Sequence, residues 1–131
     1  MTIKHLTASQ LMTPNPIMIA PTATLRAAAH IMSQQKLHCL LVPGDSNHLV
    51  GVITSKDIVQ VLCNADVEIL DQLHVSDAQT TPAVTVQEQF LIVDCLRLMR
   101  MSGVRSVPVL RGLLPVGILS FTDILHATVD V

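Results

Sequence analysis

Apolar residues follow two spacings in the first half of the chain. Short segments rich in Ile, Leu or Val predict buried strands, and they lie at 17–20, 38–42 and 49–53. Between the first two runs, apolar residues recur with the period of a helix that packs one face on a core. These residues are Leu25, Ala28, Ala29 and Met32. Thr22 or Thr24 is placed to cap this helix, and another helix is expected to begin at Ser55.

The second half repeats this order. Short segments rich in Val, Ile or Leu at 84–86, 105–110 and 116–119 predict strands, and a last helix is expected from Phe121. The helical spacing returns at Ile92, Cys95, Leu96 and Met99. Each half therefore predicts a β-α-β-β-α unit of an α/β (α+β) fold. A three-stranded sheet of this size exposes one apolar face, so we expect the two units to pack through their sheets.

A direct comparison of the halves supports an internal duplication. A shift of 67 residues places Ser9 on Ser76, and the same shift also superimposes the following pairs: Thr13 on Thr80, Met32 on Met99 and Val42 on Val109. After these strands the shift becomes 66, which places Gly51 on Gly117. The change falls in the turn at 43–47, which is rich in turn-forming residues, and turns tolerate single deletions.

One seven-residue stretch occurs twice, once at the end of the third strand of each half. It reads GVITSKD at 51–57 and GILSFTD at 117–123. Each copy leads from a glycine through an aliphatic strand to a hydroxyl and, three residues later, an aspartate. The hydroxyl–aspartate pairs fit a capping box, in which side chain and backbone at a helix start satisfy each other. The same groups suit a ligand, because a carboxylate accepts hydrogen bonds from a diol and a helix start attracts phosphate.

Composition narrows the functional classes. Half of the residues are hydrophobic, the net charge is −2 and the pI is about 6.3, so no basic face for nucleic acid is implied. Phe90 and Phe121 are the only aromatic residues, which disfavours base stacking. Three scattered cysteines without CxxC spacing favour reduced core residues of a cytosolic protein. They are Cys39, Cys63 and Cys95.

Metal and catalytic interpretations have little support. The six histidines show no ligand spacing such as HxxxH, and His38 and Cys39 face opposite sides of a strand. No nucleophile–base constellation and no P-loop occur, so an enzyme is not expected. Met32 and Met99 are expected to fill the core.

The sequence favours a cytoplasmic protein. The first ten residues lack the apolar run of a signal peptide. The most apolar stretch, 107–121, is interrupted by Arg111, Gly112 and Pro115 and is too short to cross a bilayer. No membrane partner is therefore expected.

The duplicated signature resembles that of a tandem pair of CBS domains, also called a Bateman module. The resemblance rests on the two seven-residue copies, on the β-α-β-β-α order and on the strand 106–109, SVPV, which is similar to the family's usual "LPV". The corresponding strand 39–42, CLLV, has Leu41 in place of the proline. The expected division is a first repeat at 8–63, a joining segment at 64–74, which apolar residues make helical, and a second repeat at 75–128.

The resemblance implies two clefts between the repeats that bind adenosyl ligands: AMP, ADP, ATP or S-adenosylmethionine. In each cleft, the aspartate holds ribose hydroxyls, the signature hydroxyl meets phosphate or ribose, and apolar residues flank adenine. The residues implied for one cleft are Val52, Thr54, Lys56, Asp57, Val84, Val104 and Arg105. Those implied for the other are Ile17, Leu37, His38, Ile118, Ser120 and Asp123.

The two copies differ in charge. In the gamma subunit of the AMP-activated kinase, a related architecture, basic residues at the positions of His38, Arg105 and Lys56 contact phosphates. The second signature has Thr122 where the first has Lys56. The Asp57 cleft is therefore the better candidate for a phosphorylated ligand.

Two functional hypotheses follow. In the first, the chain is a regulatory sensor that binds an adenosyl ligand and modulates a partner protein that the sequence does not identify. In the second, it is a ligand-free structural or dimerisation module whose signatures only cap helices. The resemblance also implies a homodimer in which four repeats form a flat disc, held by the helices after Asp57 and Asp123 and by those that begin near Leu25 and Leu91.

Overall fold

The computed structural model describes residues 2–44 and 48–129 of the 131-residue chain. Backbone contacts divide the chain into two compact units. Ile17–Ala83 forms one unit, called here the middle unit. Met1–Pro16 and Val84–Val131 together form the other, called the terminal unit.

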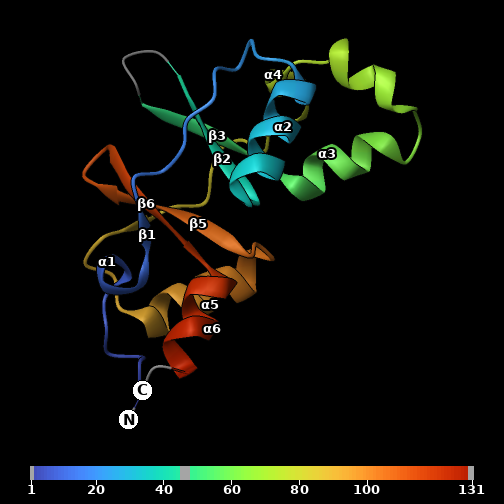
Figure 1. The fold of residues 1–131 in the computed structure, drawn as a ribbon. Helices are drawn as coiled ribbons and strands as arrows, with labels where there is room; N and C mark the ends of the chain where they lie inside the picture. Colours follow the sequence, from blue (N-terminus) through green and yellow to red (C-terminus); the bar gives the residue numbers. More distant parts are fainter. Residues whose placement is uncertain (1, 45–47, 130–131) are drawn as a thin grey trace. The chain divides into compact units, whose positions relative to one another are not determined.

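The middle unit builds helices on one antiparallel hairpin (Figure 1). In chain order its elements are α2 (Leu25–Gln35), β2 (Cys39–Pro43), β3 (Leu49–Thr54), α3 (Ser55–Leu62), the 3₁₀ helix η2 (Val67–Asp71) and α4 (Val75–Ala78). β2 and β3 pair with Leu40 opposite Ile53. The run at 17–20 forms a single parallel bridge, between Met18 and Leu41, instead of the predicted strand.

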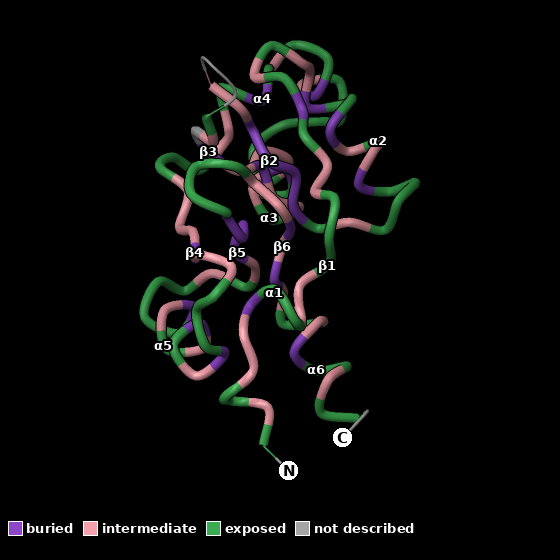
Figure 2. Tube along the Cα trace, turned by 90° about the vertical axis from the view of Figure 1, so that its left-hand side faces the viewer, coloured by how far each residue is buried: buried purple, intermediate pink, exposed green. Residues whose placement is uncertain are grey.

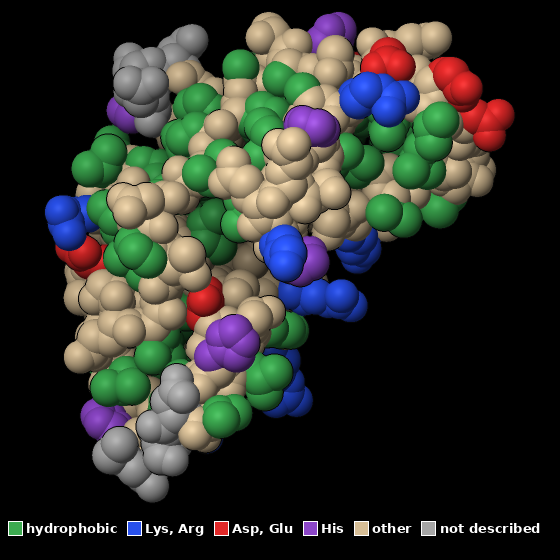
Figure 3. Space-filling model, in the orientation of Figure 1, with side chains coloured by type: hydrophobic (Ala, Val, Ile, Leu, Met, Phe, Trp, Pro, Cys, Tyr) green, Lys and Arg blue, Asp and Glu red, His purple; other side chains and the backbone are tan. Residues whose placement is uncertain are grey.

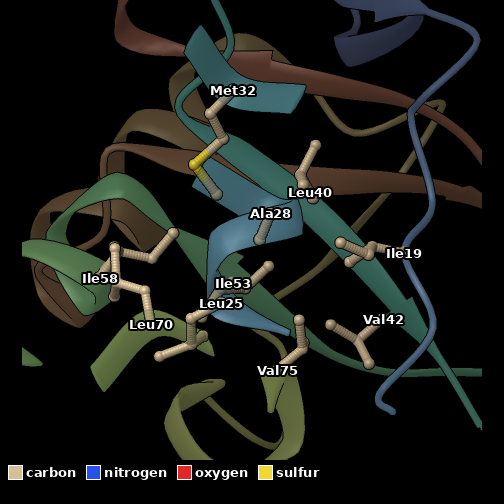
Figure 4. Packing of buried hydrophobic residues seen from close by; sticks show 10 residues of the cluster. All are labelled: Ile19, Leu25, Ala28, Met32, Leu40, Val42, Ile53, Ile58, Leu70 and Val75. Atoms are coloured by element: carbon tan, nitrogen blue, oxygen red, sulfur yellow. The ribbon is translucent and has the colours of Figure 1, made fainter. Parts of the chain in front are cut away.

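The core of the middle unit lies between this hairpin and its helices. In Figure 4, Leu25, Ala28 and Met32 of α2 lie against apolar side chains of β2 and β3. The spacing that predicted a helix is thus the buried face of α2. The remaining labelled members of the cluster are Ile19, Leu40, Val42, Ile53, Ile58, Leu70 and Val75. β2 is buried along Cys39–Val42 (Figure 2), which explains its uninterrupted apolar sequence.

The terminal unit contains a four-stranded sheet in the order β1-β6-β5-β4. Its elements are α1 (Ala8–Leu11), β1 (Thr13–Pro14), β4 (Val86–Gln87), α5 (Ile92–Ser102), β5 (Ser106–Arg111), β6 (Leu114–Ser120) and α6 (Phe121–Val129). β4 runs parallel to β5, and the other neighbours are antiparallel. Its core joins Ile92, Cys95 and Met99 of α5 to Val107, Val109 and Leu119 of the sheet.

The leading segment of each sequence repeat packs in the unit that is formed mostly by the other repeat. Helix α1 precedes the first repeat's strands, yet its fully buried Ala8 belongs to the core of the terminal unit. Helix α4 precedes the second repeat's strands, yet Val75 is buried in the core of the middle unit. Each unit therefore combines most of one repeat with the leading segment of the other.

Most predicted elements are confirmed, with two corrections besides the run at 17–20. The joining segment is helical only at Val67–Asp71, as a 3₁₀ helix that follows soon after α3, which ends at Leu62. Cys63 is exposed, because it follows the last turn of α3 beyond the packed face, whereas Cys39 and Cys95 are buried as predicted. Thr24, rather than Thr22, caps α2 by accepting a hydrogen bond from the Ala27 N–H. Of the predicted turn at 43–47, positions 45–47 lie outside the described residues.

Candidate functional site

The first signature places Asp57 at the turn from β3 into α3. The Thr54 hydroxyl accepts a hydrogen bond from the Asp57 N–H at 3.1 Å, and Asp57 Oδ2 accepts one from the Thr54 N–H at 2.9 Å. This reciprocal pair is the predicted capping box. It uses one carboxylate oxygen, so Oδ1 points away from the cap's own hydrogen bonds. Lys56, the next residue back, is exposed.

The second signature builds the same turn from β6 into α6. Asp123 Oδ2 accepts hydrogen bonds from the Ser120 N–H at 2.8 Å and from the Ser120 hydroxyl at 2.9 Å. The Asp123 N–H approaches Ser120 Oγ at 3.2 Å. Asp57 and Asp123 are both half-buried, so each carboxylate keeps access to solvent.

A threonine from the exchanged segment reaches the second oxygen of each carboxylate. Thr13 Oγ1 donates to Asp123 Oδ1 at 2.8 Å, and Thr80 Oγ1 lies 3.4 Å from Asp57 Oδ1. Thr13 pairs with Ile118 as part of β1, and Thr80 forms an antiparallel bridge with Val52. The sequence interpretation missed both threonines as site residues, although the repeat offset aligns them and each lies one or two residues before a proline.

The signature glycines make these approaches possible. A Cβ atom at Gly51 would lie 2.6 Å from the Thr80 carbonyl oxygen and 2.7 Å from Thr81 Cγ2. One at Gly117 would lie 2.8 Å from the Thr13 carbonyl oxygen and would also overlap Met12. Real Cβ contacts are longer than this, so the backbone segments approach because the glycines lack side chains.

Within the middle unit, the structure brings His38 to the Asp57 turn. The His38 carbonyl accepts the Ser55 N–H at 2.9 Å, so the first residue of α3 is tied to the residue before β2. The His38 side chain is exposed. Val52 is half-buried on β3, and Ile17 and Leu37 pack at the margin of the core.

The terminal unit repeats this arrangement around Asp123. The Arg105 carbonyl accepts the Phe121 N–H at 2.9 Å, and the Arg105 side chain is exposed. Ile118 is half-buried, and Val84 and Val104 pack at the margin of the core. Each cleft implied by the resemblance combines residues of both units, and that combination stays a prediction.

Charged side chains elsewhere form exposed ion pairs. The Arg111 guanidinium donates to Glu88 and lowers the pKa of that carboxyl, and Arg26 pairs with Asp71. Figure 3 shows basic side chains next to acidic ones at two edges of the displayed face. Burial raises the pKa of the Cys95 thiol to about 11, with a smaller contribution from Asp94. Such a thiol is a poor nucleophile and a poor metal ligand near neutral pH.

Residues 2–44 and 48–129 contain no group of three or more His, Cys, Asp or Glu side chains arranged to hold a metal ion. None of the helices in that part of the chain is long and apolar enough to cross a membrane.

A family model for the CBS domain matches the chain twice, at residues 8–64 and 75–130. The chain belongs to the CBS domain family. The two matches contain the two signature turns, so the resemblance seen in the sequence is confirmed, and the mixed α/β fold is that of CBS-domain pairs.

One curated relative and two solved structures resemble the chain over nearly its whole length. A 17.7 kDa protein of Acidianus ambivalens is 32% identical over 125 residues, which cover 94% of this chain and 73% of that protein. The structure of CBSX2 in complex with AMP is 24% identical, with a TM-score of 0.79 over 95% of this chain and 96% of that one. The CBS pair of protein MJ0100, in complex with 5′-methylthioadenosine and S-adenosylmethionine, is 22% identical, with a TM-score of 0.83 over 95% and 96% of the two chains.

Proposed function

We propose that this CBS pair is a regulatory module that senses an adenosyl ligand, AMP, ADP, ATP or S-adenosylmethionine, and modulates a partner protein. The observation that carries the proposal is the Asp57 carboxylate. Its Oδ2 satisfies the Thr54 N–H at 2.9 Å, whereas among the described residues Oδ1 has only a long contact to Thr80. A carboxylate offers about four lone-pair sites, so Asp57 retains capacity for a vicinal diol such as that of ribose.

The surroundings of Asp57 suit a nucleotide. Lys56 supplies an exposed positive charge next to the carboxylate, and the start of α3 attracts phosphate. The aliphatic side chain of Val52 lies on the adjoining strand. The complexes of CBSX2 and MJ0100 support an adenosyl ligand as the class to test first.

The alternative is a ligand-free structural module in which the turn serves only as a helix cap. The capping box at Thr54 and Asp57 favours this alternative, because all of its groups are present without a ligand. Both roles can coexist, since the cap uses Oδ2 and a ligand would use Oδ1.

Thermal unfolding separates the two. AMP, ADP, ATP and S-adenosylmethionine are each added to wild type and to Asp57→Ala. A ligand present at 100 times its Kd stabilises the folded state by about 2.7 kcal/mol, which raises Tm by several degrees. If the protein is a sensor, the ligand raises the Tm of wild type, and this shift is lost in D57A. If the turn is only a helix cap, D57A is less stable than wild type by about 0.5–2 kcal/mol, and no ligand changes the Tm of either protein.

We also propose that a second copy of the chain covers the apolar groove between α5 and α6. Leu96 of α5 lines this groove together with Phe121, Ile124 and Leu125 of α6. Phe121 is 47% exposed and Leu125 62% exposed, an arrangement typical of a surface that a partner covers. The homodimer implied by the family resemblance would bury these side chains.

A further inference from the structure

The two signature aspartates carry unequal numbers of hydrogen bonds. Among the described residues, Asp123 accepts three of ordinary length, two from Ser120 to Oδ2 and one from Thr13 to Oδ1. Asp57 accepts one of ordinary length, from the Thr54 N–H to Oδ2. Hydroxyl–oxygen hydrogen bonds are usually 2.5–3.0 Å long, so the 3.4 Å contact from Thr80 to Asp57 Oδ1 is weak.

The difference matters for a ligand with a diol. Two ribose hydroxyls need two acceptor sites on one carboxylate, and a carboxylate has about four. Three of the Asp123 sites are taken within the terminal unit, so a diol would have to displace Thr13. Asp57 has enough open sites to accept a diol while it keeps its cap.

We propose that Thr13 determines which signature aspartate binds ligand. Because Thr13 occupies Asp123 Oδ1, Asp57 alone binds the diol, and each chain binds one adenosyl ligand. The inference rests on the proposed function and adds to it the number and place of the bound ligands. Each of the two threonine–aspartate contacts that support the inference lies within a single unit. β1 is the element that sets it, because the pairing of Thr13 with Ile118 fixes the hydroxyl beside Asp123.

The test counts binding sites by isothermal titration with two probes, AMP and adenosine. Adenosine carries the diol without phosphate, so its binding reports on the aspartate with no contribution from Lys56. Thr13→Val removes the hydroxyl and keeps the β-branched shape that suits a strand. Thr13→Ala removes it a second way, and Thr13→Ser keeps it. Thr22→Val is the control, because Thr22 is exposed and lies outside both signature turns.

We expect one site per chain in wild type, T13S and T22V, and two in T13V and T13A. In T13V the affinity of the added site for adenosine should rise about 10-fold or more, because a hydrogen bond that the ligand had to displace is gone. In the double variant T13V/D57N the remaining single site should be that of Asp123. Circular dichroism confirms that each variant is folded.

Two equal sites in wild type, one site in T13V and T13A, or weaker binding in those variants, overturns the role of Thr13 and leaves the proposed function in place. No binding to wild type with one site in T13V supports the role of Thr13 and overturns the proposed function at Asp57. No binding to any variant overturns both.

Discussion

Gly51 and Gly117 show at the scale of single residues why the signature begins as it does. Each lies opposite a backbone segment from the other repeat, close enough that a Cβ atom would overlap a carbonyl oxygen. The same close approach delivers Thr80 and Thr13 to the two aspartates. The glycine therefore affects the site indirectly, because its missing side chain lets the segment that carries the threonine pack close to the strand.

Gly51→Ala should destabilise the protein by about 1–3 kcal/mol, because the added methyl group overpacks against Thr80 and Thr81. Urea unfolding would show a lower midpoint with an unchanged m-value. Gly103→Asn is the control, since no atom lies within 4 Å of the Cβ position there and Asn tolerates the left-handed backbone. Equal midpoints for wild type and G51A would show that residue 51 has room for a methyl group beside Thr80 and Thr81.

The three cysteines should differ sharply in reactivity. With the pKa of Cys95 at about 11, about one thiol in a thousand is ionised at pH 8, and its side chain is buried as well. Cys63 is exposed. We expect a disulfide reagent at pH 8 to label Cys63 in the native protein and to label Cys95 only after unfolding.

The direction of the pH dependence follows from the raised pKa of Cys95. Between pH 7 and pH 9 the native Cys95 thiol, whose pKa is about 11, should stay protonated and unlabelled. Cys63→Ser is the control and should abolish rapid labelling. Mass spectrometry identifies the site, and labelling of native Cys95 as fast as Cys63 would contradict its burial.

At the scale of elements, periodicity predicted most of the helices and strands because each buries one face. The spacing of Leu25, Ala28 and Met32 survives as the buried face of α2. The run at 17–20 failed as a strand, because its pairing with β2 is limited to one bridge, which composition does not reveal. The capping boxes followed from local spacing. Thr13 and Thr80 were missed, because their contacts depend on the exchange of segments between repeats.

The equivalent helices α2 and α5 end on different residues in the same left-handed conformation. Lys36 has φ 56° and Gly103 has φ 71°. This conformation costs an L-residue roughly 1–2 kcal/mol. Lys36→Gly should therefore stabilise the protein by about 0.5–1 kcal/mol, less than the full cost because glycine is freer in the unfolded state. Gly103→Lys should destabilise it by about 1 kcal/mol.

Chemical unfolding of both variants checks these opposite signs. Lys36→Ala is the control, since it removes the lysine side chain and keeps the backbone strain, and it should change the stability little. A loss of stability in K36G equal to that in G103K would show that the conformation at 36 is not strained.

At the scale of the whole molecule, the chain ties two compact units together by exchanging their leading segments. Helix α1 lies in the core of the terminal unit and helix α4 in that of the middle unit (Figure 1). A duplicated sequence of this kind places a signature aspartate in each unit, next to a threonine from the other repeat. The duplication supplies the equivalent positions, and small differences at each position distinguish the two sites.

Leu125→Glu should disrupt the proposed homodimer, because it places a charge in the apolar groove of α5 and α6. Light scattering after gel filtration should give wild type twice the 14.2 kDa of one chain and L125E a single chain. Leu114→Glu is the matched control, since Leu114 is 60% exposed and lies outside this groove. A wild-type mass of one chain would contradict the proposed dimer.

The measurement that tests the central claim most directly is a titration of wild type and Asp57→Asn with an adenosyl ligand and its 2′-deoxy analogue. The ligand is the one among AMP, ADP, ATP and S-adenosylmethionine with the largest thermal shift. Asn keeps an oxygen for the cap but loses the charge that strengthens a hydrogen bond to the diol. We predict that wild type prefers the ribose form by about 10-fold or more and that D57N shows little preference. An equal preference in both proteins, or no binding by wild type, would contradict the assignment of Asp57 as the ribose-binding residue.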